Sequence, residues 1–141
     1  MSRIISIDYG TKRVGLAATD DLQIIASGLT TIHSNELIAY LQKFVADNDV
    51  EAIVLGEPKT LRNEATDSSV EIEKLRKHLV RTFPSIPIQM VDERFTSKMA
   101  SHVISQSGMS KKKRQNKALV DEISAVIILQ DYMTQKGNGL R

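Results

Sequence analysis

Three strand-like segments follow one another at the start of the chain, and this succession limits the possible folds more than any other feature. The first covers residues 3–8 and is rich in isoleucine, the second covers residues 14–20, and the third covers residues 23–32. We expect Asp20 and Asp21 to form a tight turn between the second and third segments. Short connections of this kind join antiparallel neighbours, so the sequence predicts an antiparallel meander.

Helices and strands alternate in the rest of the chain. The first helix is expected to have Ser34 or Asn35 as its cap. The elements expected after it are a strand at 50–58, a polar loop at 59–66, a helix at 67–82 with Val70, Leu75 and Leu79 toward the core, a strand at 85–94, a helix at 96–108 and a final helix at 117–135. Right-handed crossovers put the last two strands beside the first. The predicted fold class is therefore α/β, with a mixed five-stranded sheet of order 3-2-1-4-5 and helices on both faces.

The length and composition indicate one ordinary globular domain. The chain has 141 residues, and we expect one domain over residues 1–135 with a frayed tail at 136–141. It has no cysteine, which excludes disulfides, iron–sulfur clusters, cysteine-based zinc sites and a cysteine nucleophile. His33, His78 and His102 lack a paired metal-ligand spacing and are interpreted as surface or helix-face residues rather than ligands or bases. No apolar run approaches the ~18–20 residues of a membrane span, and no signal peptide is evident, so we expect a cytoplasmic protein.

Acidic residues occur at the ends of strands that the predicted topology places at one edge of the sheet. Asp8 ends the first strand, Asp92 and Glu93 end the last strand, and Asp121 lies near the start of the final apolar helix. A single acid after a strand is more often a turn or cap residue, and Asp121 alone could be an acid favoured by the helix dipole. Three acids at one sheet edge instead indicate a site. The alternation of strand side chains does not decide between Asp92 and Glu93.

Three carboxylates close together need a compensating cation, because each raises the pKa of its neighbours. Mg²⁺ or Mn²⁺ is the expected cofactor, since these hard ions prefer oxygen ligands. Two such ions about 3.5–4 Å apart can activate water and stabilise the leaving oxygen in phosphodiester hydrolysis. That chemistry requires neither histidine nor cysteine.

A basic run precedes the final helix and suggests contact with nucleic acid. Its five cations are Lys111, Lys112, Lys113, Arg114 and Lys117. They form either a solvated linker or a surface that contacts phosphates without reading sequence. Lys12, Arg13 and Arg94 add positive charge beside the acids, although Arg94 could equally pair with Asp92. Aromatic residues make up only 4% of the chain, so stacking on single-stranded bases is not expected.

Four blocks, "IDYGTKRVGLAATD", "VLGEP", "VDERFTSKMA" and "KALVDEISAVIILQDY", resemble in order the signature blocks of the YqgF family. The resemblance implies an RNase H-like fold, a relation to Holliday-junction resolvases and a role as a nuclease that processes the 5′ end of pre-16S rRNA. It also implies that Asp8, Glu93 and Asp121 form a catalytic triad that binds the metal. Structured RNA, branched DNA and the ribosome or its precursors are the implied partners.

Other functions stay open on the residues alone. Resolvases of this fold carry a fourth acid one turn before the last, where this chain has Lys117 and Ala118. The missing acid motivates one alternative to the rRNA nuclease, an RNA-binding module for ribosome assembly with a vestigial site. A DNA resolvase of the Holliday-junction type is the other alternative. Nucleotide binding of the actin-like kind would need two lobes, and the length suits only one.

Overall fold

The isoleucine-rich strand β1 (Arg3–Tyr9) lies at the centre of a five-stranded sheet in a computed structural model of the chain. The structure describes residues 2–10, 12–57, 67–92 and 117–137. On one side of β1, β2 (Arg13–Thr19) and β3 (Ala26–His33) continue the sheet in antiparallel fashion. On the other side, β4 (Val50–Glu57) and β5 (Ile88–Asp92) run parallel to β1. The order β3-β2-β1-β4-β5 confirms the predicted sheet.

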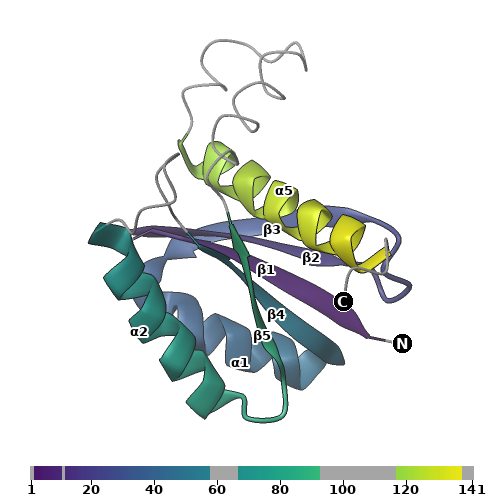
Figure 1. Cartoon of the computed structure of the whole chain (residues 1–141), viewed down its shortest axis with the longest axis horizontal. Coiled ribbons are helices and arrows are strands. Elements are labelled where there is room, and N and C mark those ends of the chain that lie inside the picture. Colours follow the sequence, from purple (N-terminus) through teal and green to yellow (C-terminus); the bar gives the residue numbers. More distant parts are fainter. Residues whose placement is uncertain (1, 11, 58–66, 93–116, 138–141) are drawn as a thin grey trace.

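Helices cover both faces of this sheet, as predicted. A 3-10 turn, η1 (Ser34–Glu36), leads into α1 (Leu37–Asp47), and α2 (Asp67–Thr82) connects β4 to β5. Figure 1 shows α1 and α2 on one side of the sheet and α5 (Lys117–Gly137) on the other. Among the described helices, none contains a stretch long and apolar enough to cross a membrane.

The alternation of side chains along β1 divides the core into two layers. Ile5 and Ile7 join the apolar cluster that contains residues of α1 and α2, whereas Ile4 joins the cluster that contains residues of α5. Because neighbours in a strand face opposite sides, Ser6 and Asp8 share the α5 side with Ile4. This layering determines which residues of β1 can form a site with α5.

The connection between β2 and β3 differs from the predicted tight turn at Asp20 and Asp21. The Asp20 carboxylate accepts hydrogen bonds from the main-chain N–H groups of Ile24 and Ile25, at 2.8 and 2.9 Å. Gln23 has a φ of 57°, in the left-handed region, and β3 begins only at Ala26. The prediction of a strand from residue 23 was wrong because a side-chain acceptor organises a longer turn there.

Two details of the helices also differ from the predictions. Neither Ser34 nor Asn35 supplies the cap: the imidazole Nδ1 of His33 accepts a hydrogen bond from the N–H of Asn35, at 3.2 Å. In α2 the bounds are as predicted, but Val70 is 58% exposed, and Ile72, which is 2% exposed, takes its place in the core. At the start of α2, the buried face therefore lies about half a turn away from the predicted one.

The remaining differences concern the ends of elements. β5 begins at Ile88 rather than at residue 85, and α5 continues to Gly137, so residues 136 and 137 are helical rather than frayed. The loop predicted at 59–66, the helix predicted at 96–108 and the tail after residue 137 lie outside the described residues.

Candidate active site

Asp8 lies at the carboxyl end of the central strand, one residue before β1 ends at Tyr9. Its side chain is half-buried and, by the alternation described above, belongs to the α5 side of the sheet. In the sheet, Asp8 is opposite Gly15 of β2, and Gly15 is opposite Thr31 of β3. A central strand holds such a carboxyl group more rigidly than a loop does.

A buried hydrogen bond sets the position of α5 along β1. The Ser6 hydroxyl donates to the main-chain carbonyl oxygen of Ala125, at 2.6 Å. Ile4, further back on β1, packs in the same cluster as Ile128 and Leu129. Figure 1 shows that α5 runs in the opposite direction to β1.

The same alignment brings the backbone of Asp121 level with Asp8. Two residues along β1 from Ser6 to Asp8 cover about 6.6 Å. Four residues back along α5 from Ala125 to Asp121 cover about 6 Å. Asp121 therefore lies in the first turns of α5 beside the end of β1 that carries Asp8.

The third predicted acid, Glu93, lies outside the described residues, and so do Arg94 and the basic residues 111–114. β5 nevertheless ends at Asp92, the residue before Glu93. Ile7 of β1 is in register with Leu55 of β4, and Leu55 is in register with Met90 of β5. The carboxyl ends of β1 and β5 thus reach the same edge of the sheet, with β4 between them.

The turn between β1 and β2 and the first residue of β2 present two cations at this same edge. Lys12 and Arg13 are both exposed. Gly10 donates its N–H to the carbonyl oxygen of Arg13, at 2.9 Å, and a Cβ at Gly10 would lie only 2.7 Å from that oxygen. The turn therefore requires glycine at position 10. The N–H of Ser34 donates to the carbonyl oxygen of Lys12, at 3.1 Å, which ties the turn to the end of β3.

The Asp8 carboxylate at this edge is a ligand of the kind that suits a hard divalent cation. Oxygen ligands are those that Mg²⁺ and Mn²⁺ prefer, and aspartate at position 121 is of the same chemical type. Within the described residues, no three histidine, aspartate or glutamate side chains come together as a metal site. Glu93 and the side chain of Asp121 are outside that comparison.

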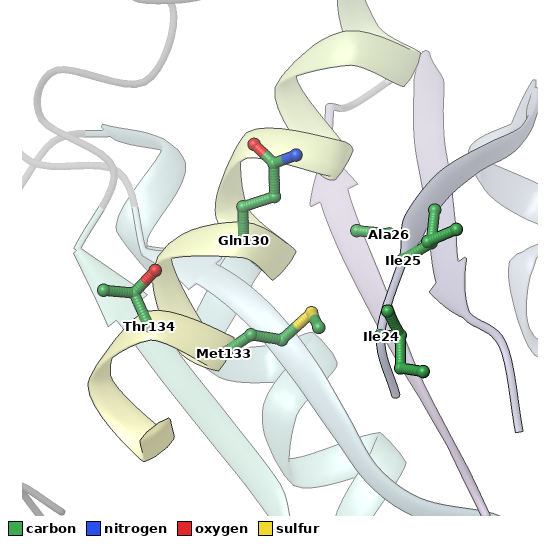
Figure 2. Close-up of a pocket in the computed structure, with 6 residues that line it drawn as sticks. All are labelled: Ile24, Ile25, Ala26, Gln130, Met133 and Thr134. Atoms are coloured by element: carbon green, nitrogen blue, oxygen red, sulfur yellow. The ribbon is translucent and has the colours of Figure 1, made fainter. Parts of the chain in front are cut away.

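The pocket drawn in Figure 2 lies at the opposite end of the sheet from Asp8. It has a volume of about 500 Å³ and is lined by Ile24, Ile25, Ala26, Gln130, Met133 and Thr134. These residues come from the start of β3 and the late turns of α5. Its lining carries no acid or histidine, so this pocket is not the candidate active site.

Three features of the site region were not predicted from the sequence. Ser6 is a polar residue within an apolar strand, two residues before Asp8, and this spacing is the signal that could have identified it. Glu122 of α5 lies over Gly28 of β3, where a Cβ would be 2.6 Å from the Glu122 Cγ. The capping role of His33 had no sequence signal, because histidine is not a favoured cap residue.

Comparisons with known proteins support the fold assignment. A fowlpox virus resolvase, solved with Holliday junction DNA, matches with a TM-score of 0.58 at 14% identity, over 94% of this chain and 97% of that chain. RuvC of T. thermophilus, solved with a Holliday junction substrate, matches with a TM-score of 0.57 at 13% identity, over 97% of both chains. With the sheet order, these two likenesses confirm the RNase H-like fold.

Sequence comparisons identify the family. A protein of Flavobacterium psychrophilum named "Putative pre-16S rRNA nuclease" is 54% identical over 136 residues, 96% of this chain and 99% of the relative. A protein of Bacteroides thetaiotaomicron with the same name is 51% identical over the same shares of the two chains. The family model RuvX, described as Holliday junction resolvase, matches residues 2–135. The chain therefore belongs to the RuvX family, which confirms the resemblance found in its sequence blocks.

Proposed function

We propose that this chain is a divalent-metal-dependent nuclease that hydrolyses phosphodiester bonds, with the 5′ end of pre-16S rRNA as its substrate. Membership of a resolvase family and the names of its half-identical relatives support a hydrolase of this class. The observation that carries the proposal is the alignment of Asp8 with Asp121 through the bond from Ser6 to Ala125. A cytoplasmic location goes with this substrate.

In the proposed site, Asp8, Glu93 and Asp121 would hold Mg²⁺ or Mn²⁺. A bound divalent cation of this kind supplies Lewis-acid stabilisation for the charge that develops on the phosphate oxygens. The chain's own residues bind and orient the substrate. Lys12 in the β1–β2 turn and Arg13 at the start of β2 contact the nucleic-acid backbone. We assign the same role to Arg94, Lys111, Lys112, Lys113, Arg114 and Lys117.

The main test compares wild type with Asp8→Asn on an RNA that carries the 5′ precursor end of 16S rRNA, in Mg²⁺, in Mn²⁺ and in EDTA. We expect Asp8→Asn to lower the cleavage rate by more than about 100-fold, because a metal ligand is lost. Asp47→Asn is the matched control, since this exposed acid ends α1 before β4 begins, at the far end of the sheet. An Asp8→Asn protein that cleaves as fast as wild type contradicts the catalytic assignment.

A four-way DNA junction as second substrate tests the alternative that the family description favours. Metal-dependent cleavage of the junction, with the precursor RNA left intact, would identify a DNA resolvase. Salt-sensitive RNA binding without cleavage in either metal would instead identify a ribosome-assembly module with a vestigial site. Lys117 and Ala118, at the position of the fourth resolvase acid, motivate that comparison.

A further inference from the structure

Arg13 and His33 occupy directly opposite positions on β2 and β3. Side chains of directly opposite residues point to the same face of a sheet, with Cβ atoms about 4.5–5.5 Å apart. Val14 and Ile32, one residue inward on each strand, both pack with the α1 and α2 cluster. Arg13 and His33 therefore share the other face, the α5 side, to which Asp8 also belongs.

The register brings this pair close to Asp8. Asp8 is opposite Gly15, and Arg13 is two residues before Gly15 on the same strand. Such a diagonal neighbour lies about 7–8 Å away, within reach of a long side chain. Gly15 has no side chain that could separate Asp8 from Arg13. Asp8, Arg13 and His33 thus follow one another along one face of the sheet edge.

The cap at the start of η1 determines which nitrogen of His33 can donate. Nδ1 accepts the hydrogen bond from the N–H of Asn35, at 3.2 Å, and an accepting nitrogen carries no proton. The proton of the imidazole is therefore on Nε2. Because the His33 side chain is exposed, the Nε2–H group is a donor that a ligand can use. The capping bond thus pre-orients a neutral donor beside the guanidinium of Arg13.

We propose that Arg13 and His33 form a binding site for one backbone phosphate of the nucleic-acid substrate, on the β3 side of Asp8. Arg13 supplies the positive charge and two parallel N–H donors, and His33 supplies the Nε2–H donor. The bond from the Ser34 N–H to the Lys12 carbonyl oxygen holds the two strand ends together, so the site does not depend on a loop closing. The inference rests on the proposed function in one respect, that the ligand is a nucleic acid.

The test measures binding without cleavage, by fluorescence anisotropy of a fluorescein-labelled RNA hairpin in EDTA over a series of KCl concentrations. In His33→Asn the new side chain keeps a favoured cap acceptor for Asn35 but lacks the imidazole Nε2–H. We expect binding weaker by about 3- to 10-fold, as for a lost neutral hydrogen bond, with an unchanged slope of log K against log[KCl]. A neutral donor displaces no counterion, so the slope stays the same.

Arg13→Gln should weaken binding and also reduce that slope by about 0.7–0.9, because one phosphate contact with a cation is lost. The double variant should lose less than the product of the two single losses, since both residues hold the same phosphate. Arg81→Gln and His78→Asn, which exchange the same residue types on exposed positions of α2, are the matched controls and should bind as wild type does.

His33→Asn that binds as tightly as wild type overturns the inference. Thermal melting of His33→Asn followed by circular dichroism shows whether the cap is kept. If His33→Asn melts early, His33→Asp, which keeps a favoured cap acceptor but adds a negative charge, is measured instead, and wild-type affinity then overturns the inference in the same way. A wild-type protein that binds neither the RNA hairpin nor a four-way DNA junction overturns the proposed function itself, which separates the two failures.

Discussion

The Ser6 hydroxyl, fully buried in the central strand, donates a 2.6 Å hydrogen bond to the carbonyl oxygen of Ala125 in α5. Among the described residues, it is a polar contact between β1 and α5 within a mainly apolar layer, and it specifies their register. Asp8 lies two residues after Ser6, and Asp121 lies four residues before Ala125. This bond therefore determines whether the backbones of the two acids lie side by side along β1 and α5. A buried hydrogen bond in the core therefore determines how Asp8 and Asp121 are aligned.

Replacement of Ser6 by alanine should weaken both stability and catalysis. The lost hydrogen bond should lower the free energy of unfolding by about 1 kcal/mol, as measured by urea denaturation. We also expect slower RNA cleavage, because a shift of α5 by about 1 Å can cost about 100-fold in rate. Ser27→Ala, at an exposed position of β3, is the control and should change neither quantity. An unchanged cleavage rate in Ser6→Ala would show that α5 keeps its register without this bond.

A side chain at Gly28 on β3 should force the Glu122 side chain to move. A Cβ at position 28 would lie 2.6 Å from the Glu122 Cγ, closer than the roughly 3.5 Å at which carbon atoms pack. Because Glu122 is flexible and half-buried, it can move aside, and Gly28→Ala should lower the free energy of unfolding by only about 0.5–1.5 kcal/mol, the cost of a side chain held away from its preferred rotamer. Glu122→Ala removes the Cγ, so adding it to Gly28→Ala should restore most of that loss. Equal destabilisation by Gly28→Ala with and without Glu122 would contradict the contact.

The turn at Asp20 should make stability depend on pH in the acid range. The N–H of Ile25, with further help from that of Ile24, holds the pKa of Asp20 below its ordinary value of 3.8, against an opposing effect of partial burial. A carboxyl group with a lowered pKa in the folded state stabilises the protein above its unfolded pKa, and this contribution disappears as pH falls through the folded pKa.

Asp20→Asn can accept the same hydrogen bonds but carries no charge. Wild type should therefore exceed Asp20→Asn in melting temperature at neutral pH, and the difference should shrink as pH falls below 3.8. The measurement is a series of melting curves for both proteins between neutral and strongly acid pH. A difference that stays constant with pH would mean that the charge of Asp20 does not contribute.

The elements themselves could be predicted from the sequence because their apolar patterns are strong. The isoleucines of β1 and the long apolar run of α5 identify a buried strand and a helix packed on a sheet, and the order of elements then leaves few topologies. The place of Asp8 near the end of the central strand could also be predicted, because an acid at the end of a buried strand is conspicuous, whereas its catalytic role stays a prediction. The choice of Glu93 over Asp92 came from the family resemblance and stays a prediction.

The details that sequence patterns missed depend on contacts between distant residues. Val70 and Ile72 are both apolar, and only the packing of α2 against the sheet decides that Ile72 is buried. The cap at His33 and the long turn at Asp20 depend on side-chain acceptors whose geometry the composition does not reveal. The role of Ser6 depends on a bond to a residue 119 positions later in the chain.

The place of α5 in the chain has a consequence for synthesis on the ribosome. α5 is the last of the described α-helices, yet it alone among them lies on one face of a sheet whose central strand is made before it. While α5 is still inside the ribosome, nothing from α5 covers the apolar side chains on that face. Ile4, Ala17 and Val54 are among them. Domains fold as units during translation. The apolar layer on the Asp8 side of the sheet can therefore close only after α5 has emerged, so α5 completes the core late in synthesis.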